Sequence, residues 1–169
     1  MLNFFFPRQC PSCMEIIETD TLFCSPCFDM LSFIPTYERC PKCFTYKGEN
    51  KCFYCIQHRE LFIKKAALFE EGSPAIALLK DPEKYAKTMG ALFILALDQF
   101  SWIRPDVIYS QSPLKKVSHS MGKMYALPKF SKYNNYAGKN VLCITNTFKD
   151  FNIPLSLYSS NIFLVAFSL

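Results

Sequence analysis

The sequence predicts a two-part α/β protein, in which a small cysteine-rich module precedes a small parallel sheet with flanking helices. Eight of the nine cysteines lie in the first third of the 169-residue chain, in four C-x-x-C pairs. Three short, continuously apolar runs occur later, separated by helical or irregular segments, which is typical of a parallel sheet covered on both faces. A chain of this length can bury one ordinary core and carry one small appended module.

The four pairs CPSC, CSPC, CPKC and CFYC each place two sulfurs in a tight turn that can reach one tetrahedral ion. In a cytoplasmic chain, this many cysteines indicate metal rather than disulfides, because thiols stay reduced there. Gaps of ten and eight residues fit short hairpins between the first two pairs and between the last two. Two structural zinc ions in that sequential partition are therefore predicted, although a cross-braced partition stays open. The predicted ligands are Cys10, Cys13, Cys24, Cys27, Cys40, Cys43, Cys52 and Cys55.

Two further residues resemble metal ligands but are given other roles. His58 follows Cys55 by three residues and is expected to be a surface histidine. Cys143 lies in the apolar run VLCI and is expected to be a core cysteine.

After the cysteine pairs, the segment LFIKKAALFEEG (residues 61–72) predicts one or two strands. Ser73 and Pro74 have the form of an N-cap and a first helical position, so AIALLK predicts a short helix. A second helix start at Asp81 and Pro82 precedes an apolar stripe at helical spacing, which should face the core. The stripe consists of Tyr85, Met89, Leu92, Phe93, Ala96 and Phe100.

Buried strands are predicted at residues 106–109 (DVIY), 141–144 (VLCI) and 162–167 (IFLVAF). The boundary between the cysteine module and the α/β part is placed near residue 60. No apolar run approaches the roughly 18 residues of a membrane span. The start MLNFFFPRQC lacks the basic region and cleavage site of a signal peptide, so a cytoplasmic protein is expected.

Charge is distributed unevenly. The formal net charge of +5 falls to +1 if eight thiolates bind two Zn²⁺, with −3 on residues 1–65 and +4 on the remainder. An anionic partner should therefore meet the second part. No acid occurs between Asp106 and Asp150, where lysines alternate with aromatic residues.

Single-strand binding requires lysines along the phosphodiester backbone and aromatic rings on which bases stack. The alternative is a solvated loop with some aromatic residues folded into the core. No arginine follows Arg104 to clamp a phosphate by two bonds. The predicted nucleic-acid-binding residues are Lys115, Lys116, Lys123, Lys129, Lys132, Tyr133 and Tyr136.

The order of these features resembles the ComF family of competence proteins along nearly the whole chain. The matching segments are FFFPRQCPSC, LFCSPCFDML, FEEGSPAIALLK, DVIYSQSPLKK and GKNVLCITNTF. That family joins an N-terminal zinc module to a type I phosphoribosyltransferase-like domain and is implicated in handling transforming DNA. The resemblance implies a double zinc-ribbon module in residues 1–60 and a reduced phosphoribosyltransferase-like sheet in residues 61–169.

In phosphoribosyltransferases, the strand that corresponds to VLCI ends in an acid pair for the ribose hydroxyls of phosphoribosyl pyrophosphate. A glycine-containing turn then cradles the 5′-phosphate through its backbone N–H groups. Here Thr145 and Asn146 replace the acids, and Phe151 stands at the expected glycine. The resemblance therefore implies a degenerate substrate loop. It consists of Thr145, Asn146, Lys149, Asp150, Phe151, Asn152 and Ile153.

The predicted function is that of a noncatalytic ComF-like protein that assists uptake or processing of single-stranded DNA beside a helicase or recombination protein. One alternative is a phosphoribosyltransferase-class enzyme with a divergent site, and another is a zinc-ribbon protein–protein adaptor. A decaying gene product would also explain the altered loop. A hydrolase resting on adjacent Ser118, His119 and Ser120 is a weaker alternative, because adjacency in sequence says little about triad geometry.

Overall fold

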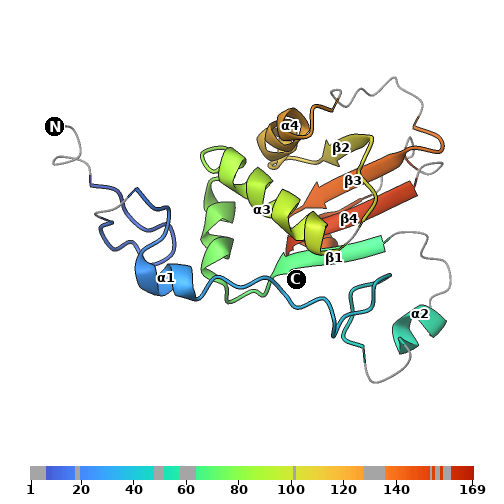
Figure 1. Ribbon diagram of the computed structural model, residues 1–169, viewed down its shortest axis with the longest axis horizontal. Coiled ribbons are helices and arrows are strands. Elements are labelled where there is room, and N and C mark those ends of the chain that lie inside the picture. Colours follow the sequence, from blue (N-terminus) through green and yellow to red (C-terminus); the bar gives the residue numbers. More distant parts are fainter. Residues whose placement is uncertain are drawn as a thin grey trace.

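The computed structural model describes residues 7–17, 20–47, 52–57, 64–100, 102–127, 136–152, 154, 157 and 161–169. Four parallel strands form one sheet in the order β1-β4-β3-β2 (Figure 1). The strands are β1 (Lys64–Phe69), β2 (Val107–Ser110), β3 (Asn140–Thr145) and β4 (Asn161–Ser168). The predicted parallel sheet is confirmed, and each of the three predicted later strands lies within one residue of an observed one.

Helices α3 (Ala86–Gln99) and α4 (Lys115–Met124) lie on the same face of this sheet (Figure 1). Phe93 of α3 and Met121 of α4 share one core with Leu142 and other strand residues. The two helices approach closely at Gly90, where an added Cβ would lie 3.2 Å from the Met121 Cγ. No helix in the described part of the chain is long and apolar enough to cross a membrane.

The opposite face of the sheet is covered by loop residues rather than by α3 and α4. Because consecutive strand residues point to opposite faces, Val141 and Cys143 face away from these two helices. Tyr136 and Leu157 are buried against them. Burial strongly raises the pKa of the Cys143 thiol, which fits the predicted core cysteine.

The two predicted helix starts differ in structure. Residues after Ser73 form a 3₁₀ helix, η2 (Pro74–Lys80), and the Ser73 hydroxyl accepts a hydrogen bond from Ala75 N at 3.4 Å. The Asp81 carboxylate accepts the Lys84 N–H at 3.1 Å and so stabilises a turn, while α3 begins only at Ala86. The predicted apolar stripe does lie against the main core, buried or half-buried along its length.

The edge of β1 that does not face β4 is bonded to the N-terminal module. Lys65 N donates to the Lys42 carbonyl at 2.8 Å, and Ile34 N donates to the Leu68 carbonyl at 2.9 Å. Phe44 packs beneath this edge among small strand residues, and its ring meets the Phe100 ring edge-on at 5.8 Å. The module and the sheet therefore share buried contacts as well as a hydrogen-bonded edge.

Candidate functional site

The eight cysteines of the N-terminal module converge into two clusters of four. Within each cluster, all four sulfur atoms lie within 4.8 Å of one another. The sequential partition is therefore correct, and the cross-braced alternative is excluded. One cluster contains Cys10, Cys13, Cys24 and Cys27, and the other contains Cys40, Cys43, Cys52 and Cys55.

The spacing of the sulfurs fits zinc. A tetrahedral ion with Zn–S bonds of about 2.3 Å requires sulfurs about 3.8 Å apart. The Sγ atoms of Cys13 and Cys24 lie 3.5 Å apart in the first cluster. In the second, Cys40 Sγ lies 3.7 Å from Cys55 Sγ. Four thiolates fill the coordination sphere and leave no position for substrate water, so both sites are structural.

Burial and hydrogen bonds shift the pKa values of several clustered thiols in different directions. At Cys10, burial opposes ionisation, but hydrogen bonds from backbone N–H groups outweigh it and lower the pKa to about 6. At Cys27, burial and the neighbouring Cys24 raise the pKa to about 12. In the second cluster, the Thr45 hydroxyl lowers the pKa of Cys52 to about 6. A divalent ion bound by all four sulfurs favours their ionisation as thiolates.

The two clusters are built by the same backbone design. Cys10 N donates to the Glu15 carbonyl and Met14 N to the Cys10 carbonyl, and the hairpin at Cys40 repeats both bonds. Met14 and Phe44 occupy equivalent positions, with φ of 67° and 61°, in the left-handed region that favours glycine. The second pair of each cluster leads into a short helix, α1 (Ser25–Asp29) or α2 (Phe53–Gln57). The repeat thus extends beyond the cysteines themselves.

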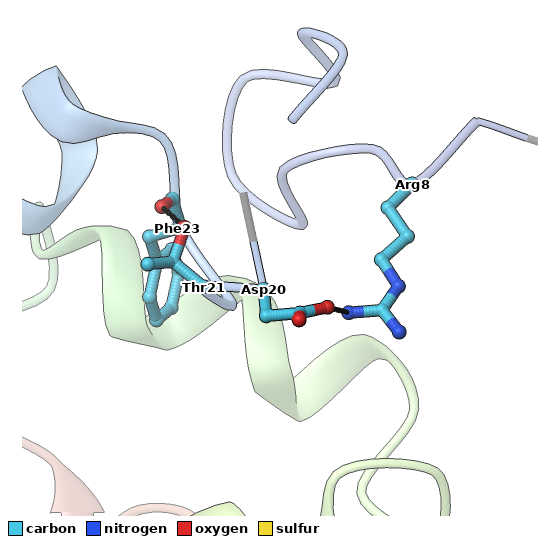
Figure 2. Close-up of polar contacts among 4 residues, drawn as sticks. All are labelled: Arg8, Asp20, Thr21 and Phe23. Carbon is cyan, nitrogen blue, oxygen red and sulfur yellow. Dashed lines mark hydrogen bonds and ion pairs between the residues drawn. The ribbon is translucent and has the colours of Figure 1, made fainter. Parts of the chain in front are cut away.

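Polar contacts help to close the loop within the first cluster. Figure 2 shows the Arg8 guanidinium directed at the Asp20 carboxylate, 2.8 Å away. The Thr21 hydroxyl donates to the Phe23 carbonyl at 2.9 Å, and the Phe23 side chain is buried in the main core. Because Arg8 and Asp20 are exposed, their ion pair contributes at most about 1 kcal/mol. Metal ligation and the burial of Phe23 are therefore the main restraints on this loop.

A family model described as a double zinc ribbon domain matches residues 1–56. This match covers one third of the chain and includes all eight clustered cysteines. The search of curated proteins found no match, and no solved structure matches the chain. The N-terminal part is therefore a double zinc ribbon whose two four-cysteine sites fit two structural zinc ions.

The loop after β3, which corresponds to a substrate loop in the resemblance, bonds to its own chain. The Thr145 hydroxyl donates to the Thr147 carbonyl at 2.9 Å. The Phe151 ring packs edge-on against the Tyr109 ring, with ring centroids 6.3 Å apart. Gln111 Nε2 donates a hydrogen bond to the backbone carbonyl of Asn152, which follows Phe151 in the chain. The loop is thus folded onto the sheet face that α3 and α4 leave uncovered.

Among the described side chains, the end of β3 presents Thr145, Asn146 and Thr147 rather than carboxylates. The Asn146 side-chain oxygen is buried without a hydrogen-bond partner among the described residues. One neutral acceptor cannot replace two carboxylates that hold Mg²⁺ and ribose hydroxyls. Lys149 is exposed on the short helix η3 (Phe148–Asp150). The side chain of Asp150 and the whole of Ile153 lie outside the described part of the chain.

The predicted nucleic-acid residues occupy different environments. Lys115, Lys116 and Lys123 lie on the exposed face of α4. Tyr136 does not fit the prediction, because its side chain is only 2% exposed in the core and offers no ring face to a base. The remaining predicted residues, Lys129, Lys132 and Tyr133, lie outside the described residues.

The adjacent Ser118 and His119 do not form a catalytic arrangement. The Ser118 hydroxyl accepts from the Ser110 hydroxyl at 2.7 Å and donates to the Lys115 carbonyl. His119 is exposed on the next position of the helix. The serine is thus a structural link between β2 and α4.

Sequence reasoning missed a cavity of about 480 Å³ at the amino end of the sheet. Its walls come from α3, the segment before β2, the end of α4, β3 and β4, so no local motif encodes it. Two features of the sequence mark it in retrospect. The chain's single tryptophan, Trp102, and its last arginine, Arg104, both line this cavity.

Proposed function

We propose that this protein is a noncatalytic ComF-like protein that binds single-stranded DNA on the exposed face of α4, with the zinc ribbons as a structural module. In this proposal the α/β part is a reduced phosphoribosyltransferase-like scaffold, and a helicase or recombination protein supplies the DNA. The cysteine pattern, the parallel sheet and the altered loop after β3 support it.

The observation that carries the proposal is the arrangement of charge on α4. Lys115, His119 and Lys123 follow one another at four-residue intervals, so they form one stripe along the helix. Val117 and Met121 are buried against the core and fix the helix beneath that stripe. The lysines at the two ends of this stripe attract a phosphodiester backbone without reading its sequence.

The neighbouring Lys116 is the least free of the three lysines. It forms an ion pair with Glu83, and both side chains are more than half exposed. Such an exposed pair is weak, so a phosphate can displace Glu83 at little cost. The three lysines together therefore offer a compact site for a few phosphates.

The first test is fluorescence anisotropy of a labelled single-stranded oligonucleotide, titrated with zinc-loaded protein across a salt series. For single strands, the slope of log affinity against log salt is about −0.7 per phosphate contacted. The triple variant K115A/K116A/K123A should weaken binding at low salt and make the slope about 2 units shallower, because about three contacts are lost.

The matched control is K47A/K80A/K87A, which removes three exposed lysines from other elements and changes net charge equally. It should keep most of the affinity and the slope. If both variants lost the same DNA affinity, the loss would follow from net charge alone, and a binding site on α4 would be contradicted. No binding at low salt would contradict DNA binding altogether.

A second expectation concerns transferase chemistry. Calorimetric titration with phosphoribosyl pyrophosphate and Mg²⁺ should show no binding heat, because Thr145 and Asn146 supply no carboxylate and Phe151 blocks a backbone cradle. Saturable, Mg²⁺-dependent heat would contradict the noncatalytic proposal and favour an enzyme with a divergent site. A titration with Mg²⁺ alone provides the baseline.

An adaptor function is the second candidate, and exposed apolar side chains on the ribbons favour it. Nine of the twelve exposed large hydrophobic residues in the described part of the chain belong to the ribbon module. Ile16 and Tyr46 occupy equivalent hairpin positions and are 62% and 67% exposed. A contiguous apolar surface is what a protein contact requires, and these side chains supply apolar groups for one. Absence of DNA binding in the anisotropy experiment would favour this candidate.

A further inference from the structure

The cavity at the amino end of the sheet has the composition of a small-molecule site. Its volume of about 480 Å³ falls in the range of roughly 300–1,000 Å³ that is typical of ligand pockets. It is also separate from the loop after β3, which lies beyond the carboxyl end of that strand. Its lining residues are Leu97, Asp98, Trp102, Ile103, Arg104, Pro105, Tyr125, Leu142 and Phe163.

Aromatic rings form much of the wall. Trp102 packs against Phe163, with ring centroids 5.3 Å apart, and against Phe100 at 5.2 Å. These contacts hold the half-buried indole in place before any ligand arrives. Tyr125, at the end of α4, contributes a further half-buried ring. Flat aromatic surfaces of this kind favour a planar ligand that can stack.

Two opposite charges supply the polar contacts. The Arg104 guanidinium donates to the Tyr125 carbonyl and lies 5.9 Å from the centre of the Tyr125 ring, so two contacts hold it beside Tyr125. A guanidinium has five N–H donors, and this bond engages one. The Asp98 carboxylate supplies acceptors and no donors. Burial, followed by the charge of Asp98, raises the pKa of Tyr125, so the phenol stays neutral.

A ligand that matches both charges must present neighbouring N–H donors to a carboxylate and acceptors to a guanidinium. Guanine presents N1–H beside an exocyclic amino group, and its O6 and N7 accept from arginine. Other common bases lack two adjacent donors on one edge. We propose that the cavity binds a guanine ring among Trp102, Tyr125 and Phe163, with Asp98 accepting from the donor edge and Arg104 donating to the acceptor edge.

Trp102 provides a direct test, because it is the only tryptophan in the chain and lines the cavity. Titration of the zinc-loaded full-length protein with guanosine should quench its fluorescence and reach saturation. Inosine lacks the exocyclic amino group and should bind about tenfold more weakly, as expected for one lost hydrogen bond to a charged acceptor.

The variant D98N separates recognition from general affinity for aromatic compounds. It should weaken guanosine binding about tenfold and abolish the preference over inosine, because the amide replaces one acceptor oxygen by an NH₂ donor, which cannot pair with a second donor of guanine. Asp98 is exposed near the C-terminal end of α3, where an acid is unfavourable, so this change should not harm folding. The control variant D29N makes the same chemical change on the first ribbon and should bind guanosine and inosine as the wild-type protein does.

A parallel titration with an oligothymidine that carries one guanine shows whether the natural ligand is a base of single-stranded DNA or a free nucleoside. Tighter quenching by this strand than by guanosine assigns the cavity to a base of single-stranded DNA, and weaker quenching assigns it to a free nucleoside. K115A/K116A/K123A should retain guanosine binding, since the cavity does not depend on the stripe of α4. Linear quenching without saturation, or equal binding of guanosine and inosine, would overturn the proposal.

Discussion

Chelation of zinc is expected to unfold both ribbons and to destabilise the sheet that they contact. Structural zinc contributes about 10–16 kcal/mol in small zinc-finger peptides, which is comparable to the roughly 5–15 kcal/mol net stability of an ordinary domain. The ribbons are joined to the rest of the chain through buried Phe23 and Phe44. Unfolding of the ribbons therefore removes packing from both cores.

Single substitutions should separate the two sites. C13S and C43S are each expected to lower bound zinc from two ions per chain to one, measured by elemental analysis after gel filtration. Only C43S should shift Trp102 emission to longer wavelength, because the second hairpin lies beside Trp102 and contributes Cys40 and Phe44 to a small cavity there. C143A should keep two zinc ions, since Cys143 is a core residue remote from both clusters.

Loss of zinc from both sites after either single substitution would show that the ribbons fold as one unit and not as two. Full retention of two ions would contradict the assignment of the ligands. A chelator-resistant circular dichroism spectrum and unchanged thermal unfolding would contradict zinc as the source of folding free energy.

Glycine at equivalent positions of the two hairpins should change stability in opposite directions. Met14 and Phe44 both have positive φ, which costs a residue with a side chain about 1–2 kcal/mol. Met14 is 59% exposed, so M14G loses little packing and should raise the free energy of unfolding by about 1 kcal/mol. Phe44 is 4% exposed, so F44G also removes a buried ring.

Truncation of a buried phenylalanine costs about 3–5 kcal/mol, so F44G should lower the free energy of unfolding by about 2–4 kcal/mol after the backbone gain. Denaturant unfolding of zinc-loaded protein measures both changes. F44L is the matched control: it keeps the strained backbone and much of the apolar volume, so its loss should be smaller. Equal effects of M14G and F44G would contradict the packing of Phe44 against Phe100.

The zinc module was the part best predicted from sequence, because a C-x-x-C pair carries its geometry locally. The assignment of pairs to ions was not local. Cys10 can reach either the second or the third pair through loops of ordinary length, and loop-closure entropy differs little between them. The short gaps of ten and eight residues favour the sequential partition, and the convergence of the sulfurs confirms it.

The strands were also predictable, since three apolar runs match β2, β3 and β4. The side of the sheet on which each helix lies was not encoded in those runs. Tyr136 shows the same limit: in a polar segment, an aromatic residue can contact solvent or enter the core, and its burial depends on Val107 and Leu157 from distant segments. The cavity that contains Trp102 likewise depends on tertiary contacts alone.

The second ribbon covers the free edge of β1 by hydrogen bonding, so loss of its zinc ion should expose that edge to other chains. An uncovered strand edge exposes N–H and C=O groups that can pair with another chain. In β1, Lys64 and Lys65 are followed by the uncharged run AALF, which offers little electrostatic resistance to such pairing. We therefore expect zinc starvation to uncover a template for intermolecular sheet growth, which would make the second ion important for solubility as well as for shape.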